Sequence, residues 1–193
     1  MKKILSLIIF GFLLSNIYGC SPTNILASGG ATTMAIADGE RSFGTVVDDA
    51  TIIINITAKF INSPDNLFIN INTAILEGRV LLTGLVDNQE IRIDAVRRVW
   101  EVDGVNEVIN EIQIGDRSTL KEYANDVWIT TQAKGKAATI VGLKVVGYNF
   151  ETIQGKVYIA GITKSSKQLE TLIDATKTIK GVKEIVNYVI VKK

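Results

Sequence analysis

The strongest constraint on the fold is an internal repeat, because the chain aligns with itself at an offset of 77 residues without a gap. Solenoid repeats are shorter, at about 20 to 50 residues. The offset therefore predicts two copies of one small domain, over residues 41–116 and 117–193. The matched pairs are Asp49 with Asp126, Ile52 with Ile129, Gly78 with Gly155, Val80 with Val157, Gly84 with Gly161, Gly104 with Gly181, Val105 with Val182 and Asn110 with Asn187.

Each copy predicts the order helix, strand, strand, helix, strand. A side-chain cap is expected to begin the first helix, at Asp48 or Asp49 in the first copy and at Asn125 or Asp126 in the second. A turn at Glu77-Gly78 or Gln154-Gly155 then joins two strands into a hairpin. The strands and second helices are expected at 67–73, 80–86, 89–102 and 105–114, and at 144–152, 157–163, 166–180 and 182–191.

The expected fold class is α+β, with two tandem domains that each contain a three-stranded mixed sheet. A right-handed parallel crossover from the second to the third strand places both helices on one face of the sheet. The opposite face of the third strand is polar in the first copy and largely apolar in the second, where we expect the first domain to cover it. The residues compared are Glu107, Ile109, Glu111 and Gln113, against Glu184, Val186, Tyr188 and Ile190.

The first twenty residues have the pattern of an exported lipoprotein. Lys2 and Lys3 precede an apolar run over 4–14, which is too short for the roughly 30 Å hydrocarbon core of a bilayer. Cys20 is the chain's single cysteine and follows Gly19 at a position that resembles a lipobox. We therefore expect residues 1–19 to be a signal peptide and Cys20 to carry the lipids. The alternative is an ordinary signal peptide with a chance cysteine.

Residues 20–40 are expected to connect the lipidated cysteine to the first domain. Small and polar residues dominate this segment, so it predicts a flexible tether. By resemblance to the sorting rule of enteric bacteria, Ser21 favours the outer membrane over the inner one. The expected location is the outer membrane, lipid-anchored and facing the periplasm.

Composition excludes several kinds of site. The chain has no histidine, and its cysteine is assigned to lipid, so common zinc sites, Ser-His-Asp triads and Cys-His pairs cannot form. We expect no metal, no cofactor, no small-molecule substrate and no enzymatic activity.

Charge is divided unevenly between the halves. Residues 38–116 hold 6 Lys and Arg against 14 Asp and Glu, a net charge of −8, whereas residues 117–193 hold 13 against 6, a net charge of +7. The basic half favours an anionic partner. Nucleic acid fits the charge but not the exported location.

The segments described above resemble the BON domain family, and in particular the dual-BON outer-membrane lipoproteins of the DolP type. The most specific stretch is 125–131, Asn-Asp-Val-Trp-Ile-Thr-Thr. The resemblance implies that the second domain binds anionic phospholipid and supports outer-membrane integrity. It also rests on Arg41-Ser42-Phe43-Gly44-Thr45 before Asp48-Asp49, on the hairpin glycines 78, 84, 155 and 161, and on the segments 104–108 and 181–183.

Trp128 is expected to lie off the core face of its helix. That face is predicted from Ile52, Ile53, Ile56 and Phe60, whose repeat partners are Ile129, Thr130, Ala133 and Ala137. An indole flanked by lysines is typical of a membrane interface. The candidate phospholipid-binding residues are Val127, Trp128, Thr131, Gln132, Lys134, Gly135 and Lys136.

Two alternatives stay open from the sequence. In the first alternative, Trp128 is buried against the other domain or under the linker instead of facing a membrane. Trp100 is interpreted separately, as an interdomain or half-buried residue. In the second, the chain is an envelope protein-interaction module that binds an assembly factor or an unfolded outer-membrane protein through the strand face around Tyr188. Salt distinguishes phospholipid binding from protein binding, because added salt weakens binding to an anionic lipid surface more than binding of a protein through apolar side chains.

Overall fold

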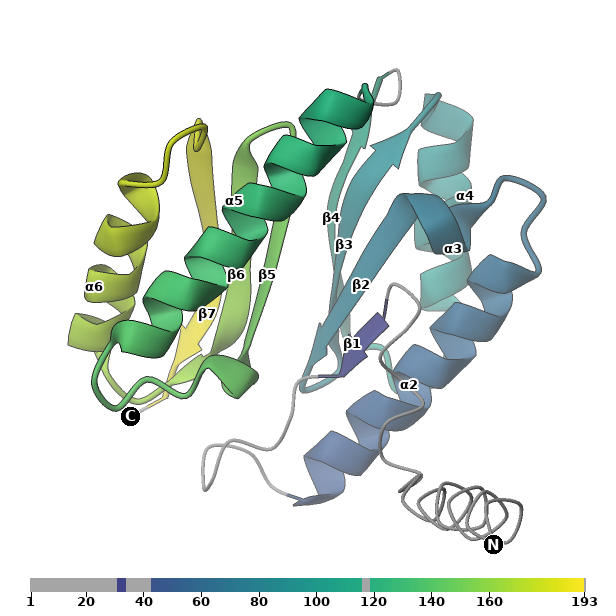
Figure 1. Ribbon diagram of the computed structural model, residues 1–193. Coiled ribbons are helices and arrows are strands. Elements are labelled where there is room, and N and C mark those ends of the chain that lie inside the picture. Colours follow the sequence, from purple (N-terminus) through teal and green to yellow (C-terminus); the bar gives the residue numbers. More distant parts are fainter. Residues whose placement is uncertain (1–30, 34–42, 116–118, 193) are drawn as a thin grey trace, which may run out of the picture.

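The computed structural model describes residues 31–33, 43–115 and 119–192, which form two domains in tandem, each made of helices and one sheet (Figure 1). The expected signal peptide, Cys20 and most of the expected tether lie outside the described residues. No helix within the described ranges is long and apolar enough to cross a bilayer.

The two domains have the same order of elements, and the expected α+β fold is confirmed. In each sheet the first pair of strands is antiparallel and the second pair is parallel. The first domain contains α2 (Phe43–Ile61), α3 (Leu67–Asn70), β2 (Ile71–Leu76), β3 (Arg79–Val86), α4 (Gln89–Trp100) and β4 (Glu107–Ile114). The second contains α5 (Leu120–Thr139), the short 3-10 helix η2 (Val145–Gly147), β5 (Tyr148–Ile153), β6 (Lys156–Thr163), α6 (Ser166–Lys177) and β7 (Glu184–Val191).

Both first helices begin earlier than the sequence predicted. Thr119 caps α5 through a capping box, in which its hydroxyl accepts the Glu122 amide and the Glu122 carboxylate accepts the Thr119 amide. The expectation that Asp126 caps this helix was therefore wrong, because Asp126 lies inside it. Asp49 lies inside α2 in the same way.

The predicted first strand of each hairpin was too long at its beginning. Residues 67–70 form the short helix α3, and residues 145–147 form η2, before β2 and β5 begin. A four-residue helical segment carries no periodic pattern, so an apolar run of this length reads as a strand.

Residues 31–33 form a further strand, β1, within the segment expected to be a tether. It pairs in parallel with Thr73–Ile75 of β2 and also contacts α2. The first sheet thus has the order β1-β2-β3-β4, whereas the second has β5-β6-β7. The edge that β1 covers in the first domain carries no strand among the described residues of the second.

Each domain has a core between its helices and one face of its sheet. The predicted core face of α2 is confirmed, since Ile52, Ile53, Ile56 and Phe60 are all buried. In α5 the buried positions are Ile129, Ala133 and Ala137, with Thr130 partly exposed. These residues fix which side of each helix faces solvent.

The remaining faces of the two sheets pack against each other and join the domains. Figure 1 shows the sheets between α6 on one outer side and α4 on the other. The expectation that the first domain covers the second sheet is confirmed by one apolar cluster from both sheets. It contains Ala74, Leu76, Leu81, Ala160 and Ile162, with Ile109, Tyr188 and Ile190 partly buried against it.

Polar contacts border this interface and join the acidic domain to the basic one. The Tyr188 hydroxyl donates to the Glu111 carboxylate, and the Gln113 side-chain amide donates to the Tyr158 hydroxyl at 3.1 Å. Lys156 lies 3.5 Å from Glu111, and Lys192 forms an ion pair with Glu77. The strand face around Tyr188 is therefore occupied by the first domain and is not free to bind another protein.

Candidate functional site

Helix α5 exposes a large apolar surface on the sides that do not face its core. A buried stripe at Ile129, Ala133 and Ala137 anchors the helix. Four large side chains lie outside that stripe and remain exposed. They are Leu120, Tyr123, Val127 and Trp128, the first of them 84% exposed.

The predicted phospholipid-binding residues occupy different sides of α5. At 100° per residue, Trp128 and Gly135 lie opposite the buried stripe, with Gln132 beside them. Val127, Thr131 and Lys134 lie on a second side, which lines a cleft between the domains. Lys136 is partly buried and does not line the cleft. Six of the seven residues are therefore divided between an outward face and a cleft wall, and the seven do not form one patch.

Trp128 is 46% exposed and belongs to none of the buried clusters formed by the described residues. Nor does it line the interdomain cleft. An added Cβ at Gly135, two turns away on the same face, would meet no atom within 4 Å. The Trp128 indole therefore lies on the same solvent-exposed face of α5 as Gly135.

Trp100 serves as a comparison in the first domain. It is the last residue of α4, is 52% exposed and takes no part in the apolar cluster between the sheets. It is thus half-buried, which is one of the two alternatives expected from the sequence, and it is not part of the apolar cluster between the domains.

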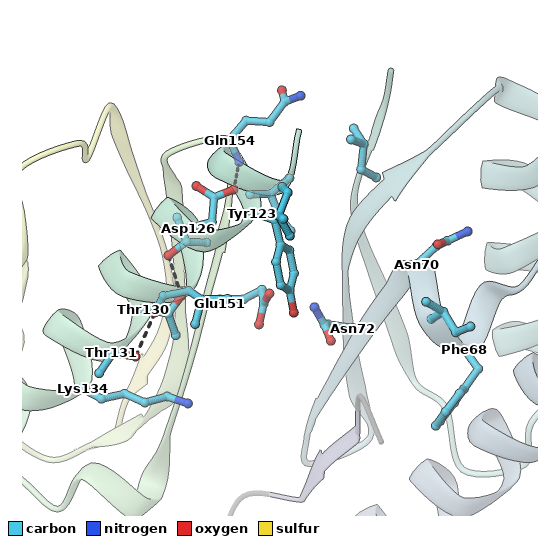
Figure 2. Close-up of a pocket in the computed structure, with 16 residues that line it drawn as sticks. Phe68, Asn70, Asn72, Tyr123, Asp126, Thr130, Thr131, Lys134, Glu151 and Gln154 are labelled. Atoms are coloured by element: carbon cyan, nitrogen blue, oxygen red, sulfur yellow. Dashed lines mark hydrogen bonds between the residues drawn. The ribbon is translucent and has the colours of Figure 1, made fainter. Parts of the chain in front are cut away.

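The cleft lies between α5 and β5 of the second domain and α3 and β2 of the first, and has a volume of about 870 Å³ (Figure 2). Apolar side chains on its walls include Phe68, Ile69 and Tyr123, and polar ones include Asn72 and Thr130. The sequence did not predict this cleft, because its walls come from both domains and depend on the interface between the sheets.

Glu151 is the carboxylate that points into the cleft from β5, toward Asn72 with Tyr123 beside it (Figure 2). Burial raises the pKa of Glu151 to about 7. The nearby positive charge of Lys134 lowers this pKa by a smaller amount, and the negative charge of Asp126 raises it further. The Glu151 carboxylate has no hydrogen-bond partner among the described residues. The cleft therefore holds a carboxyl group whose charge changes near neutral pH.

This pKa makes a prediction about stability. In the unfolded chain Glu151 titrates near its ordinary value of 4.5, so the folded protein binds the proton more tightly and its stability falls as pH rises from about 4.5 to 7. Glu151→Gln should remove this part of the pH dependence and be more stable than wild type above pH 7. Urea unfolding between pH 4.5 and 8 measures the difference, with the exposed Glu170→Gln as control. A constant difference between Glu151→Gln and wild type across this range would contradict the assignment.

Comparison with known proteins identifies the family of the two repeated domains. The sequence profile described as "BON domain" matches residues 48–116 and 125–193. The chain belongs to the BON domain family. Each match covers most of one domain, and together they cover most of the chain.

Relatives with two-thirds or more of their length covered come from several bacteria. An uncharacterised protein of Anaplasma centrale, from the gshII 5′ region, is 41% identical over 76% of this chain and 96% of its own length. Outer membrane lipoprotein DolP of Haemophilus influenzae is 30% identical over 82% of each chain. Osmotically-inducible protein Y of Escherichia coli is 28% identical over 75% of this chain and 73% of its own.

A buried aspartate has the same contacts in both BON domains. The Asp126 carboxylate accepts the backbone amides of Gln154 and Gly155 at 2.7 and 2.8 Å. Asp49 accepts the amides of Glu77 and Gly78, both at 2.9 Å. In each BON domain a carboxylate from the first helix thus holds the hairpin turn, whose two residues have positive φ. These contacts give the aspartate a structural role in place of acid-base chemistry.

The described parts of both BON domains hold no group of three or more acidic, cysteine or histidine residues arranged to bind a metal ion. Three features of the described residues bear on binding. They are the outward face of α5, the cleft, and the edge of β5 that does not pair with β6.

Proposed function

We propose that this chain is an outer-membrane lipoprotein, anchored through Cys20 and facing the periplasm, whose second BON domain binds anionic phospholipid through α5. In this proposal it supports outer-membrane integrity and catalyses no reaction. The similarity to the Haemophilus influenzae outer membrane lipoprotein supports the location. The observation that carries the lipid proposal is the exposure of Trp128 on the face of α5 opposite its core.

The outward surface of α5 has the chemistry of a membrane interface. Tryptophan is favoured at headgroup depth because its ring is apolar and its N–H forms a hydrogen bond. Exposed Leu120 and Val127 add apolar area on the neighbouring side of the helix, which lines the cleft. Lys121 and Lys134 are exposed on α5, and each basic residue near an anionic surface contributes about 1 kcal/mol. Contact with lipid requires no enclosed site.

Trp128→Glu is expected to weaken binding to anionic vesicles at least about tenfold, since it removes the indole and adds repulsion from the lipid charge. The protein should be residues 21–193, which retain every described residue. Co-sedimentation with phosphatidylcholine vesicles, with and without phosphatidylglycerol, measures the affinity. Trp100→Glu is the matched control, because Trp100 is similarly exposed but lies on the first domain; it should bind like wild type.

Salt provides a second criterion for the same proposal. Binding to the phosphatidylglycerol vesicles should weaken as ionic strength rises. If the wild-type protein does not sediment with these vesicles even at low salt, or if Trp100→Glu and Trp128→Glu lose binding equally, α5 is not the lipid-binding surface.

A further inference from the structure

The edge of the first sheet shows how a BON domain of this chain can take a fourth strand. β1 pairs in parallel with Thr73–Ile75 on the free side of β2, and it also contacts α2. A strand therefore fits between the sheet edge and the flank of the first helix.

The repeat places the same site in the second domain at residues 150–152 of β5. β5 pairs with β6 on one side only. The cleft lies along its other side, with Glu151 and Thr152 on one wall and Val127 and Lys134 of α5 on another. The cleft thus occupies the position that β1 fills in the first domain.

The backbone of β5 is oriented to receive a strand. The turn Gln154-Gly155 is a two-residue hairpin, so Ile153 and Lys156 form the hydrogen-bonded pair next to it. Hydrogen-bonded and outward-facing residues alternate along the strand. The N–H and C=O groups of Thr152 and Phe150 therefore face away from β6. Their repeat partners, Ile75 and Thr73, are the two ends of the β2 segment that pairs with β1.

We propose that the β5 edge binds an extended segment of a partner protein, which adds to the second sheet as a parallel fourth strand within the interdomain cleft. This is β-augmentation, in which main-chain hydrogen bonds supply affinity and wall pockets select side chains. It rests on the β5 edge and not on Trp128, although Val127 and Lys134, which line the cleft, are also among the residues proposed to bind lipid.

The occupant is a segment of another protein because the described residues contain one strand of this kind, and it already covers β2. Phe68, Ile69 and Tyr123 on the walls favour apolar side chains. Lys134 is the basic residue on the walls, and Asp126 and Glu151 are the acidic ones, so neither sign of charge has a large excess and the matching segment is apolar with little net charge.

The test uses a synthetic peptide with the sequence of residues 29–36 of this chain, which includes the strand that fits the equivalent edge. It is titrated into isotope-labelled residues 21–193 while amide signals and hydrogen exchange are followed by NMR. The proposal expects saturable binding, with slower exchange at Phe150 and Thr152. Thr152→Pro removes the outward N–H and should weaken binding at least about tenfold.

Thr152→Val is the matched control. Both substitutions remove the hydroxyl contact between Thr130 and Thr152, but valine keeps the backbone N–H, so this variant should bind the peptide like wild type. The exchange measurement on the wild-type protein decides the question even if the proline variant fails to fold. Absence of saturable binding, protection at Thr73 and Ile75 instead of β5, or equal affinity of the proline and valine variants would each overturn the proposal.

Discussion

Asp126→Ala is expected to lower the free energy of unfolding by about 3 to 5 kcal/mol. The carboxylate is 8% exposed and accepts two backbone amides of the β5–β6 turn. Hydrogen bonds to a charged group contribute about 1.5 to 3 kcal/mol each, and their loss leaves two amides of the turn without their partner. Denaturant unfolding followed by circular dichroism measures the change.

Two further substitutions make the Asp126 prediction specific. Asp126→Asn keeps the shape but has one accepting oxygen, so it should fall between wild type and alanine. Asp48→Ala is the control, because Asp48 is an exposed aspartate of α2 next to the buried Asp49; it should change stability by less than about 0.5 kcal/mol. A loss below 1 kcal/mol for Asp126→Ala would show that the turn holds without its helix carboxylate.

Gly84→Ala is expected to destabilise the first domain by at least about 3 kcal/mol or to prevent its folding. Gly84 has φ +151°, and a Cβ there would lie 2.2 Å from the Asn70 carbonyl oxygen and 3.0 Å from the Ile71 Cα. Both atoms are backbone at the junction of α3 and β2, so no side chain can move aside. Thermal unfolding of residues 21–193 measures the effect.

Alanine substitutions at two other glycines provide comparisons for the stability change expected at Gly84. Gly161, its repeat partner, would place a Cβ 2.8 Å from the Gly147 oxygen, so alanine there should be damaging but less so. Gly135→Ala should instead stabilise α5 by up to about 1 kcal/mol, because the site is open and alanine favours the helix. Equal effects at all three positions would mean that the close approach of β3 to residue 70 does not require glycine.

The sequence predicted the parts of the fold that depend on local patterns. The repeat, the hairpin strands 80–86 and 157–163, and the apolar stripe of α2 all lie where expected, because turn residues mark a hairpin locally and helical periodicity reports which side of a helix is buried. The apolar face of β7 even indicated the contact between the domains. Trp128 was correctly placed away from its helix core for the same reason.

Other features depend on contacts that no local pattern encodes. Asp126 precedes an apolar helical stripe, as a capping residue does, and its true partners are 28 and 29 residues away. β1 comes from a segment of small residues that resembles a tether, and it is ordered by pairing with β2. To predict the cleft and the burial of Glu151, one must know how the two sheets are placed relative to each other. The residue pattern within a single domain does not carry that information.

The contact between Glu111 and Tyr188 joins two residues that are separated by 77 positions, the period of the repeat. Equivalent residues that touch lie near a twofold axis, so the two domains are arranged like the subunits of a symmetric dimer. Two identical first domains in this arrangement would bring one Glu111 against another, and their carboxylates would repel. Divergence at this position therefore makes pairing within one chain more favourable than pairing between first domains of two chains.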